Sequence, residues 1–213
     1  MSLGHGLGIH MIQKQWKCFA AALVVCSPLG ALAQSDNSFV TSYRLEAERR
    51  FEAATSSIQL LADSGDEFAQ MRVAWLAYQA GNYNASVSGY LQLLQRNPTM
   101  IEARLGLLLP LMAQERWQDA AAQARIILTQ SPWDYTAHVR LFVCEEALKQ
   151  WDALEAHAGA FSRAYPSDAT ALVYLARARA HLKNTAGARE AYALVLARLP
   201  AHQEAIAFLK TIN

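Results

Sequence analysis

Four histidines after residue 33 are candidates for metal binding or proton transfer: His138, His157, His181 and His202. Two histidines on one helix can share a metal when they stand three or four residues apart, and no two of these have that spacing. We therefore expect them to lie in different units or faces of the fold. The same part of the chain has no nucleophile elbow and no HExxH, CxxC, Walker or GxGxxG motif. The sequence predicts a protein that is not an enzyme, with no catalytic residue, metal site or cofactor.

The cysteines offer equally little chemistry. Cys18 and Cys26 precede residue 33, in a segment with the features of an export leader, and only Cys144 follows it. Loss of that leader would leave one cysteine and no internal disulfide. A lone exposed thiol would pair with other molecules in an oxidising compartment, so we expect Cys144 to be buried in a helix.

Residues 1–33 have the three parts of a signal peptide in order. Lys14 and Lys17 precede an apolar run at 18–26, Pro28 interrupts it, and the small-residue triplet 31–33 follows. A charged region, a hydrophobic region and a small-residue cleavage site define such a leader. The pattern predicts export across a membrane.

Cleavage after Ala33 would leave Gln34 as the first residue of a periplasmic or secreted protein. The alternative is a retained leader that anchors the protein in the inner membrane. A spanning helix needs about 20 apolar residues, whereas Pro28 and Gly30 interrupt this run. We therefore favour cleavage and expect no membrane span in the mature chain.

The charge of the remaining chain is nearly balanced. Without Lys14 and Lys17, 17 basic residues stand against 18 acidic ones, and they are scattered along the sequence. No basic stripe is present that would attract a phosphate backbone. The composition therefore predicts no nucleic-acid partner.

A period of 34 residues organises the chain after residue 66. Prolines at positions 98, 132, 166 and 200 are spaced by 34 residues, which is typical of stacked helix-turn-helix units. Twelve residues before each proline stand Ser86, Ala120, Leu154 and Ala188. A mostly small side chain at this position would let the two helices of a unit approach closely. Four units follow, at 67–100, 101–134, 135–168 and 169–202.

In its period, its closing proline and its small second-helix residue, the chain resembles the tetratricopeptide repeat family. The resemblance covers residues 67–202. It implies an all-α fold, a right-handed α-solenoid of stacked antiparallel helix pairs. The family's early Trp and Gly positions hold other residues here, so the resemblance does not identify a partner.

Local signals mark where helices begin and bend. Thr99 with Glu102 has the pattern of a capping box, and Asp66, Asp134 and Ser167 are plausible N-caps. Gly81-Asn82 and Lys183-Asn184 predict turns within units one and four. Pro110 lies inside a predicted helix and should kink it, with Gly106 easing the bend. Such a kink either widens a binding groove or is a tolerated local distortion.

The two ends of the array should be covered. Residues 38–62 carry apolar side chains at three- and four-residue steps without Gly or Pro. They predict one long capping helix or a degenerate repeat within 34–66. Residues 203–213 predict a C-terminal capping helix, because terminal repeats otherwise expose their stacking faces.

The family resemblance implies that the first helices of the units line a concave groove. The first-helix side chains that point away from the paired helix mix aromatics with arginines, a composition enriched at interaction surfaces. The candidates are Arg72, Trp75, Tyr78, Gln79, Leu109, Met112, Arg140, Val143, Glu146, Tyr174, Arg177 and His181. Trp75 and Tyr174 could instead pack between adjacent units.

Three arginines in this set suggest a ligand. Arg72, Arg140 and Arg177 could hold an acidic segment or chain end through paired N–H donors, or they could form a solvated face. The sequence thus predicts a protein or peptide partner and a role as an adaptor of the cell envelope, for example in secretion, pilus or exopolysaccharide assembly. The alternative is a periplasmic chaperone that holds unfolded clients.

Overall fold

The computed structural model describes residues 28–211, with side chains from residue 37 onward. Most of the predicted leader lies outside the described residues, as do the last two residues of the predicted C-terminal cap. Within the described range the chain forms eleven helices and no strand. They are α1 (Pro28–Ala47), α2 (Phe51–Asp63), α3 (Glu67–Gln79), α4 (Tyr83–Arg96), α5 (Ile101–Ala113), α6 (Trp117–Gln130), α7 (Tyr135–Ala147), α8 (Trp151–Ala164), α9 (Ala169–His181), α10 (Thr185–Arg198) and α11 (Gln203–Thr211).

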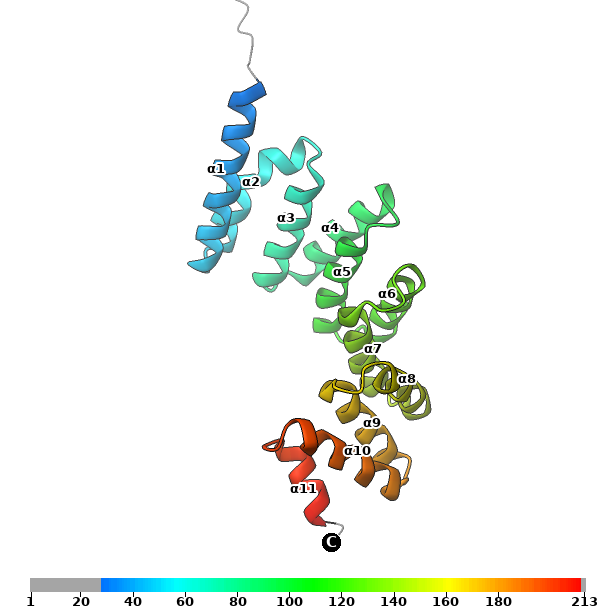
Figure 1. Ribbon diagram of the computed structural model, residues 1–213. Helices are drawn as coiled ribbons and strands as arrows, with labels where there is room; N and C mark the ends of the chain where they lie inside the picture. Colours follow the sequence, from blue (N-terminus) through cyan, green and yellow to red (C-terminus); the bar gives the residue numbers. More distant parts are fainter. Residues whose placement is uncertain (1–27, 212–213) are drawn as a thin grey trace, which may run out of the picture.

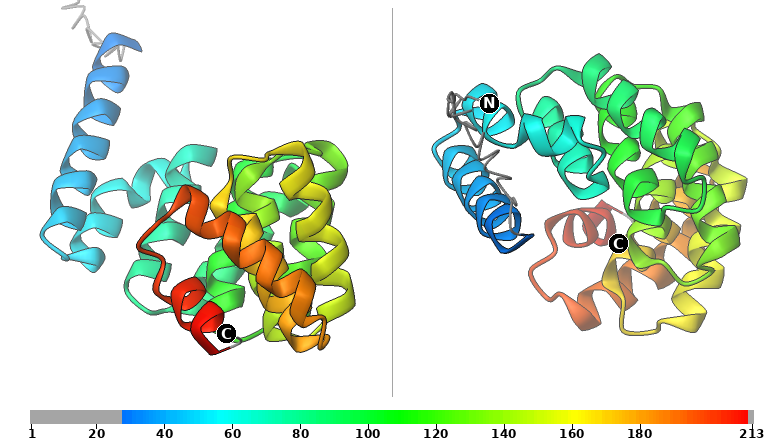
Figure 2. Two further views of the ribbon diagram at one scale, coloured as in Figure 1. Left: turned by 60° about the horizontal axis from the view of Figure 1, so that its bottom comes forward. Right: turned by 90° about the horizontal axis from the view of Figure 1, so that it is seen from above.

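The helices stack in antiparallel pairs from α1 at the top to α11 at the bottom (Figure 1). Each helix packs on the next, and α3, α5, α7 and α9 also contact one another in series. Seen from above, the array winds clockwise as it recedes, which is a right-handed turn (Figure 2). The predicted all-α, right-handed solenoid is confirmed.

The second helices approach the first through the positions that the 34-residue period singles out. Ser86, Ala120, Leu154 and Ala188 are all fully buried. In the first pair of the periodic region, Gly89 serves the same purpose, since a Cβ there would lie 3.0 Å from the Cβ of Ala74. The spacing of these small residues therefore sets how closely each pair packs.

Residues 38–62 do not form one long helix, so that alternative is wrong. Helix α1 ends at Ala47 and α2 begins at Phe51, and the two pack as a helix pair. The turn between them depends on Arg49, whose φ is +60°. Residues 28–33 of the predicted leader lie at the start of α1, and the predicted cleavage site after Ala33 falls within this helix.

Three aspartates at intervals of 34 residues cap first helices. Side chains of Asp66, Asp134 and Asp168 accept hydrogen bonds from the amides three residues later. The first two were predicted, whereas Ser167 is wrong by one residue. The Thr99 capping box is also wrong, because the N-cap of α5 is Met100 and the Thr99 hydroxyl bonds the Asn97 side chain instead.

Helix α5 continues through the buried Pro110 to Ala113. Gly106 has a role that the sequence did not suggest, because it faces the ring of Tyr90 from the preceding pair. A Cβ at Gly106 would lie 2.4 Å from two carbons of that ring. The missing side chain therefore admits Tyr90 between two helix pairs. None of the helices between residues 28 and 211 is both long and apolar enough to cross a bilayer.

Candidate functional site

The predicted site residues lie on the first helices of the pairs, which form the first-helix face (α1, α3, α5, α7 and α9). Most of them are half-buried, including Trp75, Tyr78, Met112 and Tyr174. Gln79, Leu109, Val143 and Glu146 are also half-buried. His181 is exposed and stacks flat on Trp151, with 3.8 Å between ring centroids.

Arg72 is not available to hold an acidic ligand, which corrects the prediction. Its side chain is 4% exposed, and it donates to the Ser42 hydroxyl and, at 2.8 Å, to Oε2 of Glu46 on α1. Its guanidinium also lies 3.5 Å above the ring centroid of Tyr43. Arg72 therefore joins α3 to α1, a helix that the sequence did not identify as part of a pair.

Arg177 joins three helices in the same way. It donates from Nε and Nη2 to the two carboxylate oxygens of Glu204 on α11, at 2.8 and 2.6 Å, and contacts Glu146 on α7 at 3.3 Å. The Tyr192 hydroxyl donates to the same carboxylate at 2.6 Å. The hydrogen bond from Arg177 holds the pKa of Glu204 below its ordinary value and raises that of the arginine.

Arg140 makes the third connection, from α7 to α5. It donates to the backbone oxygen of Leu105, and burial lowers the pKa of its guanidinium. All three predicted arginines therefore bond neighbouring first helices or the end helix. Their donors hold the stack together, so they do not form a set of free cations for an anionic segment.

Trp75 and Tyr174 both contact the preceding helix pair, as the packing alternative anticipated. The Trp75 indole donates to Oε1 of Glu46 at 2.5 Å. Tyr174 lies 5.4 Å, between ring centroids, from Phe142 on α7. Both rings are only half-buried, so one part of each packs and another part faces solvent.

A pocket of about 440 Å³ opens on the first-helix face where α1, α3 and α5 meet. We call it the aromatic pocket; it is lined by Tyr43, Glu46, Phe68, Met71, Arg72, Trp75, Tyr90 and Glu102. Sequence reasoning identified only Arg72 and Trp75 of this set. The others were missed because α1 was not recognised as half of a pair, and because Tyr90 reaches the pocket from a second helix.

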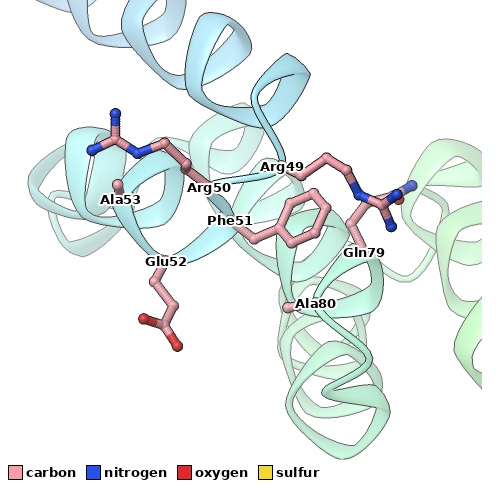
Figure 3. A pocket seen from close by; sticks show the side chains of 7 residues that line it. All are labelled: Arg49, Arg50, Phe51, Glu52, Ala53, Gln79 and Ala80. Atoms are coloured by element: carbon pink, nitrogen blue, oxygen red, sulfur yellow. The ribbon is translucent and has the colours of Figure 1, made fainter.

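A more polar cavity, of about 600 Å³, lies at the α1–α2 turn (Figure 3). Arg49 and Arg50 flank the Phe51 ring there, and Glu52 points away from both arginines. Arg50 is bonded to Glu48 at 3.2 Å. This cavity has one aromatic wall and no buried polar side chain directed into it, which makes the aromatic pocket the stronger candidate.

Two of the histidines come together, contrary to the prediction that all four lie apart. His138 and His157 are on α7 and α8 of one pair, and Nδ1 of the first lies 2.8 Å from Nε2 of the second. Nε2 of His138 faces the Pro132 oxygen, and Nδ1 of His157 faces the buried Glu145 carboxylate, both at 2.9 Å. Spacing along one helix could not show this contact, because the pair forms across a helix turn.

Because the Pro132 oxygen can only accept, Nε2 of His138 carries the hydrogen, and a neutral His138 accepts from His157. Burial lowers the pKa of His138, which favours this neutral form. No group of three or more His, Cys, Asp or Glu side chains in the described part of the chain is arranged to hold a metal ion. Cys144 is buried, as predicted, and burial raises its thiol pKa to about 11.

No protein-family model and no curated protein sequence matches the chain. Solved structures do. MamA from Desulfovibrio magneticus RS-1 superposes with a TM-score of 0.70 at 14% identity, covering 80% of this chain and 97% of that one. YrrB, a TPR protein with an unusual peptide-binding site, superposes with a TM-score of 0.69 at 16% identity, covering 85% and 95%.

A third similar structure is PilW, a type IV pilus biogenesis factor. It has a TM-score of 0.64 at 18% identity, and 82% of each chain is covered. At such low identities the similarity establishes how the chain folds, while the residues of each binding face differ.

Proposed function

Since the chain has the fold of tetratricopeptide repeat proteins, we propose that it is a non-catalytic scaffold or adaptor that binds a peptide segment or a protein subunit. The partner would lie along the first-helix face, in the concave groove of the superhelix. The similarity to YrrB, whose structure is described as having a peptide-binding site, supports this proposal.

The observation that carries the proposal is the row of half-exposed aromatic side chains on this face. Trp75, Tyr78 and Tyr174 each keep part of a large ring in contact with solvent, and Tyr43 and Phe68 at the aromatic pocket are 49% and 50% exposed. Rigid aromatic rings supply much of the binding energy at protein interfaces. Exposed rings gathered on one face therefore fit a docking surface better than a solvated one.

We further propose that the protein acts in the bacterial cell envelope, after cleavage between Ala33 and Gln34. The signal-peptide pattern of residues 1–33 supports this location, and the similarity to the pilus factor PilW supports a role in assembly. N-terminal sequencing of the protein recovered from a periplasmic fraction should begin at Gln34. Recovery of the uncleaved chain from the membrane fraction would favour the anchored alternative.

Site-specific photocrosslinking in cells tests the docking face. A photoreactive amino acid at Tyr78 or Tyr174 should capture one stoichiometric partner, identified by mass spectrometry. The control position is Leu91 on α4, an exposed second-helix residue, where the same probe should capture nothing specific. Many unrelated products from Tyr78 and Tyr174 would indicate a chaperone, and equal labelling at all three positions would contradict the proposed face.

A further inference from the structure

The walls of the aromatic pocket are aromatic rings from three helices. Tyr43 comes from α1, Phe68 and Trp75 from α3, and Tyr90 from α4. Trp75 is fixed in orientation because its indole N–H donates to Glu46. Ring faces carry partial negative charge and attract cations placed over them.

This environment already holds one cation against a ring. The guanidinium of Arg72 lies 3.5 Å above the ring centroid of Tyr43, at the bottom of the pocket. Its charge is balanced by Glu46, 2.8 Å away, and its side chain is 4% exposed. A second ligand in the pocket therefore meets Arg72 as part of a closed ion pair.

Glu102 supplies the remaining charge. It is exposed on the first turn of α5, and nothing between residues 28 and 211 forms an ion pair or side-chain hydrogen bond with it. The charged groups of the lining are therefore a neutralised Glu46–Arg72 pair and one unpaired carboxylate. A basic side chain entering here would gain the attraction of Glu102 and of the ring faces, whereas an acidic one would be repelled.

We propose that the aromatic pocket binds a lysine or arginine side chain of the partner segment. The inference rests on the proposed function, because it specifies which kind of residue docks on the first-helix face. It reverses the charge expected from the sequence, in which the arginines of this face suggested an acidic partner. The volume of about 440 Å³ accommodates one long side chain together with part of its backbone.

The test is an NMR titration of the ¹⁵N-labelled full chain with short capped peptides that are identical except for a central Arg, Lys, Leu or Glu. The Trp75 indole resonance, assigned with Trp75→Phe, reports on the pocket. The Arg and Lys peptides should shift it in a saturable way that weakens with added salt. The Leu and Glu peptides should leave it unchanged at the same concentrations.

Glu102→Gln should weaken binding of the Arg peptide about fivefold, the effect of losing one partly exposed charge pair. Glu52→Gln is the matched control, because Glu52 is also exposed at the second position of its helix but lines the cavity at the α1–α2 turn. It should leave binding unchanged. Phe68→Leu keeps an apolar wall without the ring face and should also weaken binding of the Arg peptide.

Equal responses to all four peptides, no response to any of them, or unaltered affinity in Glu102→Gln would overturn the inference. The crosslinking experiment separates this from a failure of the proposed function. A single crosslinked partner without a response to basic peptides leaves the docking face standing and removes only the cationic specificity. A saturable response to basic peptides without any crosslinked partner would support the pocket and count against the adaptor role.

Discussion

The contact between Gly106 and Tyr90 shows how one residue determines the packing of two helix pairs. Tyr90 is 4% exposed, and burial raises its pKa to about 12. Its ring occupies the place where any larger residue at position 106 would put a Cβ. The sequence displayed Gly106 only as a neighbour of Pro110, since nothing in a 34-residue period reveals which side chain of the previous unit approaches it.

Gly106→Ala should therefore destabilise the protein, although alanine is the better helix former. We expect a loss of about 1–3 kcal/mol in the free energy of unfolding, the usual cost of overpacking a tight site. Urea unfolding followed by circular dichroism measures it. In a double-mutant cycle with Tyr90→Leu, which removes most of the ring, the cost of Gly106→Ala should fall. An unchanged cost would mean that the ring is not the cause.

Glu204 gives a pH dependence with a defined sign. Because Arg177 lowers its pKa in the folded state, from an ordinary value of 4.5, the carboxylate stabilises the fold above that pH and loses its effect as the pH falls through the folded value. Glu204→Gln should cost about 1 kcal/mol at neutral pH, a value discounted for partial exposure. Urea titrations should show this difference shrinking toward zero near about pH 3.

Glu190→Gln is the control for Glu204, because Glu190 is 74% exposed and lies 3.8 Å from Arg179. Its substitution should change stability little at any pH. A loss in Glu204→Gln that stayed constant from neutral to acidic pH would show that the side chain acts through packing instead of charge.

At the scale of the helices, the sequence predicted what recurs and missed what does not recur by residue type. Evenly spaced prolines predicted where the second helices from α4 to α10 end, and Asp66 and Asp134 were recognisable caps. The turns within the pairs were harder to recognise. They place Arg49, Gly81, Glu115, Lys149 and Lys183 at positive φ, and only one of these five is the glycine that such a backbone favours. Arg49 was missed for this reason, and with it the α1–α2 pair and most of the aromatic pocket.

The same turns offer a stabilising substitution. Glu115 has a φ of +56°, in a region that costs residues with a side chain about 1–2 kcal/mol. Glu115→Gly should raise the free energy of unfolding by about 0.5–1 kcal/mol, because the gain is partly offset by the greater freedom of glycine in the unfolded chain. The reciprocal change, Gly81→Ala at φ +78°, should lower stability by a similar amount. A loss of stability in Glu115→Gly would show that its side chain makes a compensating contact.

For the whole molecule, the arginines connect what the hydrophobic core leaves as separate layers. The buried apolar side chains form three clusters along the solenoid. Arg72 joins α1 to α3, Arg140 joins α5 to α7, and Arg177 joins α7, α9 and α11. Residues that resembled a ligand site in the sequence thus couple neighbouring pairs, and the ligand site lies beside one of them.

This coupling predicts that the stack unfolds as one unit even when shortened from the inside. Deleting residues 135–168 removes α7 and α8 and joins Asp134 to Ala169, so that Asp134 can cap α9 as Asp168 does in the intact chain. The shortened protein should fold in register, with a lower midpoint and a smaller urea m-value because less surface is buried. Of the tryptophans after residue 33, it keeps only Trp75, Trp117 and Trp133, all before the junction. Fluorescence then reports the N-terminal part and circular dichroism the whole; coincident transitions would demonstrate coupling, and separate ones would show that the pairs on either side fold independently.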